Sequence, residues 1–138
     1  MKHILVAYEE EGPFERVLER SAELAKAFGA RITVTSVAPI PVRFGRGIGP
    51  FDPADPPARH EEEVRRAVAR LEKLGVRAAN GVPLFGDPGD EIVHLARTKG
   101  ADVIVLGAHE GGFWSRLAER AVDDEVAHHS PVDVLIVH

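Results

Sequence analysis

The sequence predicts an α/β domain in which five parallel strands form one sheet with helices on both faces. Short apolar runs alternate with segments of helical periodicity from one end of the 138-residue chain to the other. Strands separated by helices of this length pair in parallel through right-handed crossovers. We therefore expect a single three-layer, doubly wound domain over residues 1–138, with the strand order 3-2-1-4-5.

The first strand and helix have clear boundaries. Ile4–Val6 is a continuous apolar run, typical of a strand buried on both faces. The helix after it should start at Gly12 and Pro13, with Pro13 at the first helical position, and should stop at Gly29. Helical spacing predicts one inward stripe made of Phe14, Val17, Leu18, Leu24, Ala25 and Phe28.

The second strand and helix enclose a long irregular segment. β-branched residues predict a strand over Ile32–Val37. Residues 38–58 are dense in Pro and Gly and are expected to form a mobile loop. A helix is predicted from about Arg59 to Leu74. We interpret its Glu61–Glu63 run as a solvated first turn that the helix dipole favours.

The second half of the chain continues the alternation. Val76–Leu84 contains Pro83 and is therefore expected at an edge of the sheet. Asp87 is the expected N-cap of the third helix, which should end at Gly100. The remaining elements are expected to be a strand over Val103–Leu106, a helix over Trp114–His128 and a strand over Val132–Val137.

Two loops rich in Gly and acid follow the first and fourth strands. They are Glu9–Pro13 and Gly107–Gly112. In the expected strand order these strands are neighbours at the point where the order reverses. Open α/β sheets bind ligands at the carboxyl ends of the strands at such a point, so the two loops are the candidate functional site.

The composition excludes several kinds of function. A net charge of −5 supplies no basic field for nucleic acid. Cys is absent, so disulfides, thiolate metal sites and a Cys nucleophile are impossible. No apolar run is long enough for a signal peptide or a bilayer span, and we expect a cytoplasmic protein without membrane contact.

Five segments, in this order along the chain, resemble the universal stress protein family. The segments are Ile4–Ala7 followed by an acid, Ala22–Lys26 before Gly29 and Ala30, the turn Gly86–Pro88, Ala101–Gly107, and Ser130–Val137. The resemblance covers nearly the whole chain. It implies a small cytoplasmic homodimer linked to stress survival, and one branch of the family binds ATP through the pattern Gly-x-x-Gly, nine residues, Gly-Ser/Thr.

This chain matches the ATP pattern only in part. Gly107 occupies the first glycine position, but Glu110, Arg120 and Ala121 occupy the second glycine, third glycine and hydroxyl positions. Glycines in such a loop let backbone N–H groups close on a phosphate, whereas Glu110 adds a Cβ and a negative charge. Some of these contacts could be replaced by Gly111 and Gly112, one residue later, and by Arg116 or Arg120.

The resemblance also assigns contacts outside the glycine pattern. Glu9 occupies the place of a family Asp at the end of the first strand, and the backbone of Val37 would meet the adenine. The candidate nucleotide-binding residues are Glu9, Val37, Gly107, Gly111, Gly112, Arg120 and Val122. ATP with Mg²⁺ is a possible ligand, although the motif is degraded.

We expect a non-catalytic binding module whose partner is a nucleotide or a protein, and the alternative is an ATP-dependent switch. The apolar strand Val132–Val137 is an edge without Lys or Pro, so we expect a homodimer formed there.

No Gly-x-Ser-x-Gly elbow occurs that would mark an enzyme. Glu9–Glu11 could hold a divalent cation, but a solvated acidic turn is the simpler interpretation. Likewise, His128 and His129 fit a helix end better than a metal site.

Overall fold

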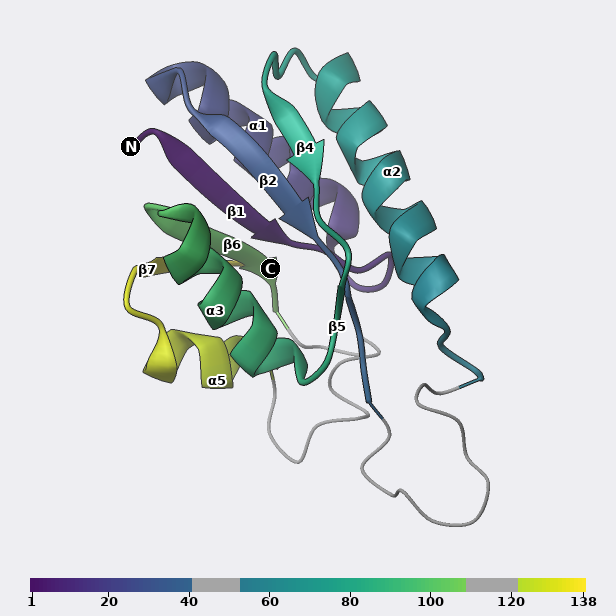
Figure 1. Cartoon of the computed structure of the whole chain (residues 1–138). Helices are drawn as coiled ribbons and strands as arrows, with labels where there is room; N and C mark the ends of the chain where they lie inside the picture. Colours follow the sequence, from purple (N-terminus) through teal and green to yellow (C-terminus); the bar gives the residue numbers. More distant parts are fainter. Residues whose placement is uncertain (41–52, 109–121) are drawn as a thin grey trace.

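The computed structural model describes residues 1–40, 53–108 and 122–138 of the chain. A five-stranded parallel sheet has the order β4-β2-β1-β6-β7, which is the expected 3-2-1-4-5 when its strands are numbered along the chain. The strands are β1 (His3–Ala7), β2 (Arg31–Thr35), β4 (Ala79–Gly81), β6 (Val103–Gly107) and β7 (Asp133–Val137). Figure 1 shows the sheet between two layers of helices.

Helices cover both faces of the sheet, as predicted. Helices α1 (Phe14–Phe28) and α2 (Pro57–Lys73) lie on one face, and α3 (Pro88–Lys99) and α5 (Val122–His129) on the other (Figure 1). Two apolar cores follow from this arrangement, because side chains of β1 alternate between the faces. Ile4 and Val6 belong to the core under α1 and α2, and Leu5 and Ala7 to the core under α3 and α5.

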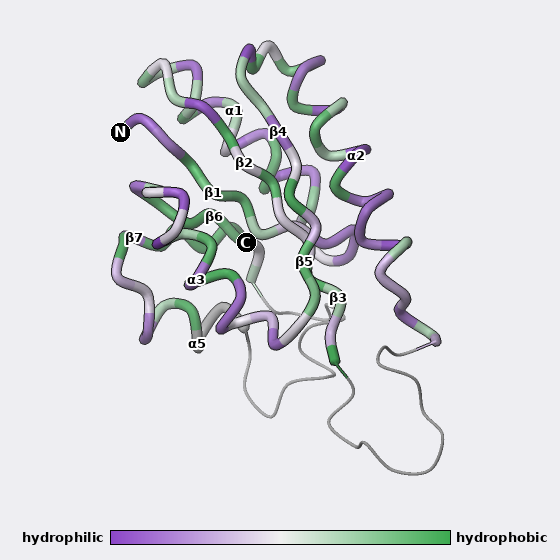
Figure 2. Tube along the Cα trace, viewed as in Figure 1, coloured by the Kyte–Doolittle hydropathy of each residue, from purple (hydrophilic) through white to green (hydrophobic). Residues whose placement is uncertain are grey.

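The second strand is shorter than predicted because the chain leaves the main sheet at Ser36. β2 ends at Thr35, and Val37 and Ala38 form β3, which pairs in parallel with β5 (Leu84–Phe85) in a separate two-stranded sheet. In the same way, the expected strand Val76–Leu84 divides into β4 and β5. β4 is at the edge of the main sheet, as Pro83 in the expected strand predicted. Figure 2 shows the β3–β5 pair beyond the end of the main sheet.

Helix boundaries differ from the predictions in a few places. α1 begins at Phe14, so Pro13 is its N-cap residue and not its first helical residue. Phe28, expected on the inward stripe, is 56% exposed in the last turn of α1. α2 begins at Pro57, within the segment expected to be loop, while residues 41–52 of that segment lie outside the described residues. Only the end of the expected helix Trp114–His128 is described, as α5.

The third helix has the predicted ends. Asp87 is the N-cap of α3, and its carboxylate accepts a hydrogen bond of 3.0 Å from the backbone N–H of Asp90. Gly100 ends the helix in the left-handed conformation, with φ of 65°, which a glycine adopts without steric cost. α3 packs against α5 and against the β3–β5 sheet.

Candidate functional site

The loops after β1 and β6 meet, as the strand order predicted. β1 pairs with β6 in parallel from Ile4 and Val103 to Ala7 and Leu106. A Cβ added at Gly107 would lie 3.1 Å from Cγ of Pro13, so any larger residue would force the two loops slightly apart. Gly12, with φ of 64°, turns the first loop over the carbonyl of Ala108. The candidate crevice is therefore built from two glycines with different roles.

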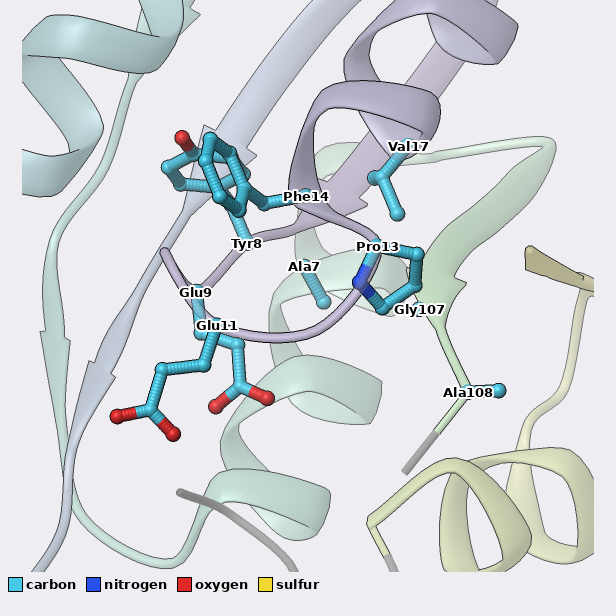
Figure 3. A pocket seen from close by; sticks show the side chains of 9 residues that line it. All are labelled: Ala7, Tyr8, Glu9, Glu11, Pro13, Phe14, Val17, Gly107 and Ala108. Carbon is cyan, nitrogen blue, oxygen red and sulfur yellow. The ribbon is translucent and has the colours of Figure 1, made fainter. Parts of the chain in front are cut away.

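A shallow hollow lies between these loops (Figure 3). It brings together Glu9 and Gly107, two of the predicted site residues. Figure 3 shows the carboxylates of Glu9 and Glu11 turned to one side of the loop, away from Pro13 and Val17. The described lining consists of Ala7, Tyr8, Glu9, Glu11, Pro13, Phe14, Val17, Gly107 and Ala108.

The aromatic part of this lining pairs the buried Tyr8 with the half-buried Phe14. The rings of Tyr8 and Phe14 meet edge to face, with their centroids 6.3 Å apart and an interplanar angle of 82°. Burial raises the pKa of the Tyr8 phenol above its ordinary value, and the charges of Glu10 and Glu15 add to the effect. Tyr8 therefore stays neutral and packs as a core residue at the floor of the crevice.

The acidic run after β1 contacts the arginines of α2. Glu10 accepts two hydrogen bonds from Arg66, at 2.6 and 2.8 Å. Glu11 lies 3.8 Å from the guanidinium of Arg59. Both carboxylates remain partly exposed, at 26% for Glu10 and 28% for Glu11, so the predicted solvated turn also joins the loop to α2. Among the residues that the structure describes, no group of three His, Cys, Asp or Glu side chains could hold a metal ion.

Val37 lies outside this hollow, in β3, and its side chain is fully buried. The direction of its backbone carbonyl follows from the hydrogen bonds of the preceding residues. The carbonyl of Thr35 accepts a hydrogen bond from Tyr8 on the β1 side, and that of Ser36 from Leu84 on the β5 side. Because successive carbonyls of a strand point to alternate sides, the carbonyl of Val37 points to the β1 side again, beyond the end of β1.

The other predicted site residues are less well placed by the structure. Gly111, Gly112 and Arg120 lie outside the described residues. Val122 is the first residue of α5, which packs against α3 and β7. Glu9, Gly107 and the backbone of Val37 thus remain as the part of the predicted site that the structure places, all at the carboxyl ends of the strands.

A buried polar cluster beside this crevice was not predicted. We call it the Ser36 network; its members are Ser36, Asp55, His60 and Glu63. Ser36 Oγ lies 2.6 Å from Nδ1 of His60 and 3.0 Å from Oε2 of Glu63. Nε2 of His60 lies 2.7 Å from Oδ1 of Asp55. All four residues are at most 3% exposed.

Glu63 corrects the interpretation of the Glu61–Glu63 run. Because α2 begins at Pro57, these residues lie in its second turn, and the third of them points into the protein. Burial raises the pKa of the Glu63 carboxyl, against the opposing effects of its hydrogen bond to Ser36 and the charges of His60 and Arg59. The helical spacing of His60, Glu63, Val64 and Ala67, all buried, is the signal that could have revealed it.

Comparisons with known proteins agree with this architecture. The model of the universal stress protein family matches residues 1–138. A universal stress protein of Thermus aquaticus, encoded in the 3′ region of the QAH/OAS sulfhydrylase gene, is 30% identical, with 99% of this chain and 98% of that protein covered.

Two solved structures of similar proteins contain nucleotides. One is a universal stress protein in complex with cAMP, 25% identical, with a TM-score of 0.74 and with 99% of this chain and 96% of that chain covered. The other is the Archaeoglobus fulgidus universal stress protein in complex with dAMP, 25% identical, with a TM-score of 0.70 and with 100% and 98% covered. Together with the match of the family model over the whole chain, these likenesses show that the chain belongs to the universal stress protein family.

Proposed function

We propose that this protein is a non-catalytic binding module of the stress response that holds an adenine nucleotide in the crevice between β1 and β6. The observation that carries the proposal is the meeting of the two loops at Gly107 and Pro13, on the side of β3 toward which the carbonyl of Val37 points. An adenine can be recognised by backbone groups at the ends of strands in an α/β sheet. The relatives solved with cAMP and dAMP support this assignment.

The charges around the crevice favour a nucleotide with few phosphates over ATP. Glu9 and Glu11 both line the hollow. The sequence adds Glu110 where the ATP-binding branch has glycine, and Ala121 where it has a hydroxyl. Two like charges 4 Å apart repel by roughly 4 kcal/mol at an effective dielectric constant of about 20, so each carboxylate near a polyphosphate weakens its binding. A cyclic or single phosphate carries less of this cost.

Calorimetric titration with cAMP, AMP and ATP, each with and without Mg²⁺, tests the proposal. We expect cAMP or AMP to bind more tightly than ATP. Glu9→Gln and Glu110→Gly should both strengthen ATP binding, whereas Glu19→Gln, the same loss of charge on the exposed face of α1, should not. The absence of binding for all three nucleotides would refute the proposal. ATP bound more tightly than cAMP and AMP would instead support the ATP-dependent switch, for which Gly107 is the remaining feature of the motif.

We propose further that the protein acts in the cytoplasm without turning over its ligand. No helix among the described residues is long and apolar enough to cross a membrane. The test of the non-catalytic assignment is incubation of the protein with the nucleotide that it binds, followed by chromatography of the products. Conversion of the nucleotide faster than in buffer, and abolished by Glu9→Gln, would contradict it.

The homodimer remains a proposal and rests on β7. This strand is at one end of the sheet order, and its side chains Val134, Leu135 and Ile136 are only half buried. Pairing with the same strand of a second copy would cover both the apolar side chains and the backbone edge. Sedimentation should show twice the chain mass of 15.0 kDa at micromolar concentration, and Leu135→Lys should shift the species to the monomer. A wild-type protein that sediments only as a monomer would overturn the proposal.

A further inference from the structure

The Ser36 network is an unusual concentration of ionisable groups in the interior. Asp55, His60 and Glu63 are each at most 3% exposed, and Ser36 is fully buried between them. Burying a charged group is costly unless it is paired and hydrogen-bonded. The cluster joins the break between β2 and β3 to the first turns of α2, at the ligand edge of the sheet. Its position suggests that it sets the geometry of that edge.

Each of the three hydrogen bonds of the network needs one hydrogen. The Ser36 hydroxyl and a neutral His60 ring supply only two, so the network must hold one further proton. In one arrangement a protonated Glu63 donates to Ser36, the Ser36 hydroxyl donates to Nδ1 of His60, and Nε2–H of His60 donates to Asp55. In a second, Nδ1–H and Nε2–H of an imidazolium donate to Ser36 and Asp55, and the hydroxyl donates to a Glu63 carboxylate. In a third, a protonated Asp55 donates to Nε2, Nδ1–H donates to Ser36, and the hydroxyl again donates to Glu63. All three arrangements satisfy the contacts of 2.6, 3.0 and 2.7 Å.

When this proton is lost, the single hydrogen of the Ser36 hydroxyl faces two acceptors, Nδ1 of His60 and the Glu63 carboxylate. A neutral His60 with its hydrogen toward Asp55 offers a lone pair to Ser36, and so does the Glu63 carboxylate. The hydroxyl has a single hydrogen, so one of its two contacts becomes an unfavourable approach of acceptors. A buried acceptor without a donor costs about 1–3 kcal/mol.

The surrounding charges act on Glu63 in both directions. Arg59 lies 3.3 Å from its Oε1 and 3.4 Å from Oδ1 of Asp55, and this cation favours the carboxylates. Glu10, held by Arg66, and desolvation favour the protonated acid, and desolvation is the largest effect on the raised pKa of Glu63. A raised pKa in the folded state means that the stabilisation is fully present below the ordinary value of 4.5 and is lost as the pH rises through the folded value.

Ser36, His60 and Asp55 also have the spacing of a nucleophile, a base and an orienting acid. Two observations argue against that role: the Ser36 side chain is fully buried, and Glu63 occupies the second contact of its oxygen. A substrate would have to replace a buried carboxylate. The geometry therefore favours positioning of the chain over attack on a ligand.

We propose that the Ser36 network holds a single exchangeable proton and that this proton fixes the Ser36–Val37 backbone at the wall of the crevice. Ser36 is the residue at which the chain leaves the main sheet. Its carbonyl accepts a hydrogen bond of 3.0 Å from the N–H of Leu84, and its side chain is hydrogen-bonded to Glu63 of α2. When the proton leaves, this tie weakens and the backbone edge at Val37 loses its fixed position. Nucleotide affinity then falls as the pH rises, an effect that rests on the proposed function.

The decisive variant is Glu63→Gln, because an amide supplies the required hydrogen at every pH. Its NH₂ group donates to Ser36 and its oxygen still accepts from Arg59. The matched control is Glu61→Gln, the same change at an exposed position of α2. In the wild type and the control, the denaturation midpoint should decrease as the pH rises from 4.5 through the raised folded pKa of Glu63. The affinity for cAMP or AMP should fall over the same range by about tenfold, as expected for one buried hydrogen bond.

In Glu63→Gln both pH dependences should flatten. The ¹⁵N shifts of the His60 ring should report a neutral ring with its hydrogen on Nε2 across the whole range. The stability and NMR measurements need no ligand, so they test the network even if no nucleotide binds and the proposed function fails. The proposal is overturned if Glu63→Gln follows the wild-type pH profile, if the wild type has no pH step beyond that of Glu63→Gln, or if Glu63→Gln does not fold.

Discussion

The close approach of Gly107 to Pro13 makes a quantitative prediction about the crevice. A Cβ at position 107 would lie 3.1 and 3.3 Å from Cγ and Cδ of Pro13 and 3.4 Å from Val17 Cγ2. The backbone of Gly107 is outside the left-handed region, so Gly107→Ala adds no backbone strain. Its cost is overpacking against a rigid ring, about 1–3 kcal/mol, which for a domain of this size lowers Tm by about 3–10 °C.

A double-mutant cycle with Pro13→Ala isolates this contact. The shortened side chain removes the atoms that the new methyl group meets, so Gly107→Ala should cost less in the Pro13→Ala background. We expect a coupling free energy of at least about 0.5 kcal/mol from chemical denaturation of the four proteins. If Gly107→Ala has the same cost in both backgrounds, the two loops do not meet at these residues, and the crevice assignment fails with them.

Three further predictions follow from other contacts. Asp87→Ala removes the N-cap of α3 and should lower the free energy of unfolding, measured in urea, by about 1 kcal/mol. Asp87→Asn keeps a capping oxygen and should be nearly neutral. Equal losses of stability in the two variants would contradict the capping role. Tyr8 is the only tyrosine, so absorbance at alkaline pH reports it alone. Burial raises the pKa of Tyr8, so the neutral phenol stabilises the fold until the pH rises through that folded pKa. Phenolate should therefore appear together with unfolding. Ionisation of the folded protein near pH 10 would refute this. Gly81→Ala places a methyl group against Cγ1 of Val64 and should destabilise by about 1–3 kcal/mol, with a smaller cost in a Val64→Ala background if that contact is the cause.

The Ser36 network connects stability with the proposed binding site. Replacing buried ionic groups by apolar residues of similar volume is often neutral or stabilising, so stability alone does not account for the network. Here the network lies at the junction of β2, β3 and α2, one residue from the backbone edge assigned to the adenine. The pH dependence of Glu63→Gln therefore decides whether this junction is a fixed support or a proton-dependent one.

Local patterns in the sequence determined the architecture. Continuous apolar runs identified β1 and β6, a single Pro and Gly-containing segment identified the edge strand, and Asp87 and Gly100 marked the ends of α3. Their effects depend on near neighbours and on strand-helix alternation, so they can be predicted without knowing what packs against them. The meeting of the two loops followed from the strand order alone, and the contact at Gly107 confirms it.

Only the tertiary structure decided which polar residues are inside. Glu61, Glu62 and Glu63 are identical in the sequence, yet only Glu63 meets Ser36 and His60, because that face of α2 packs over the end of β2. Phe28 is exposed for the converse reason, since the last turn of α1 extends beyond the core. Burial is a property of contacts between distant elements, so the run of three glutamates does not by itself show which member is enclosed. The helical register of Glu63 with Val64 and Ala67 is the part of the sequence that points to it.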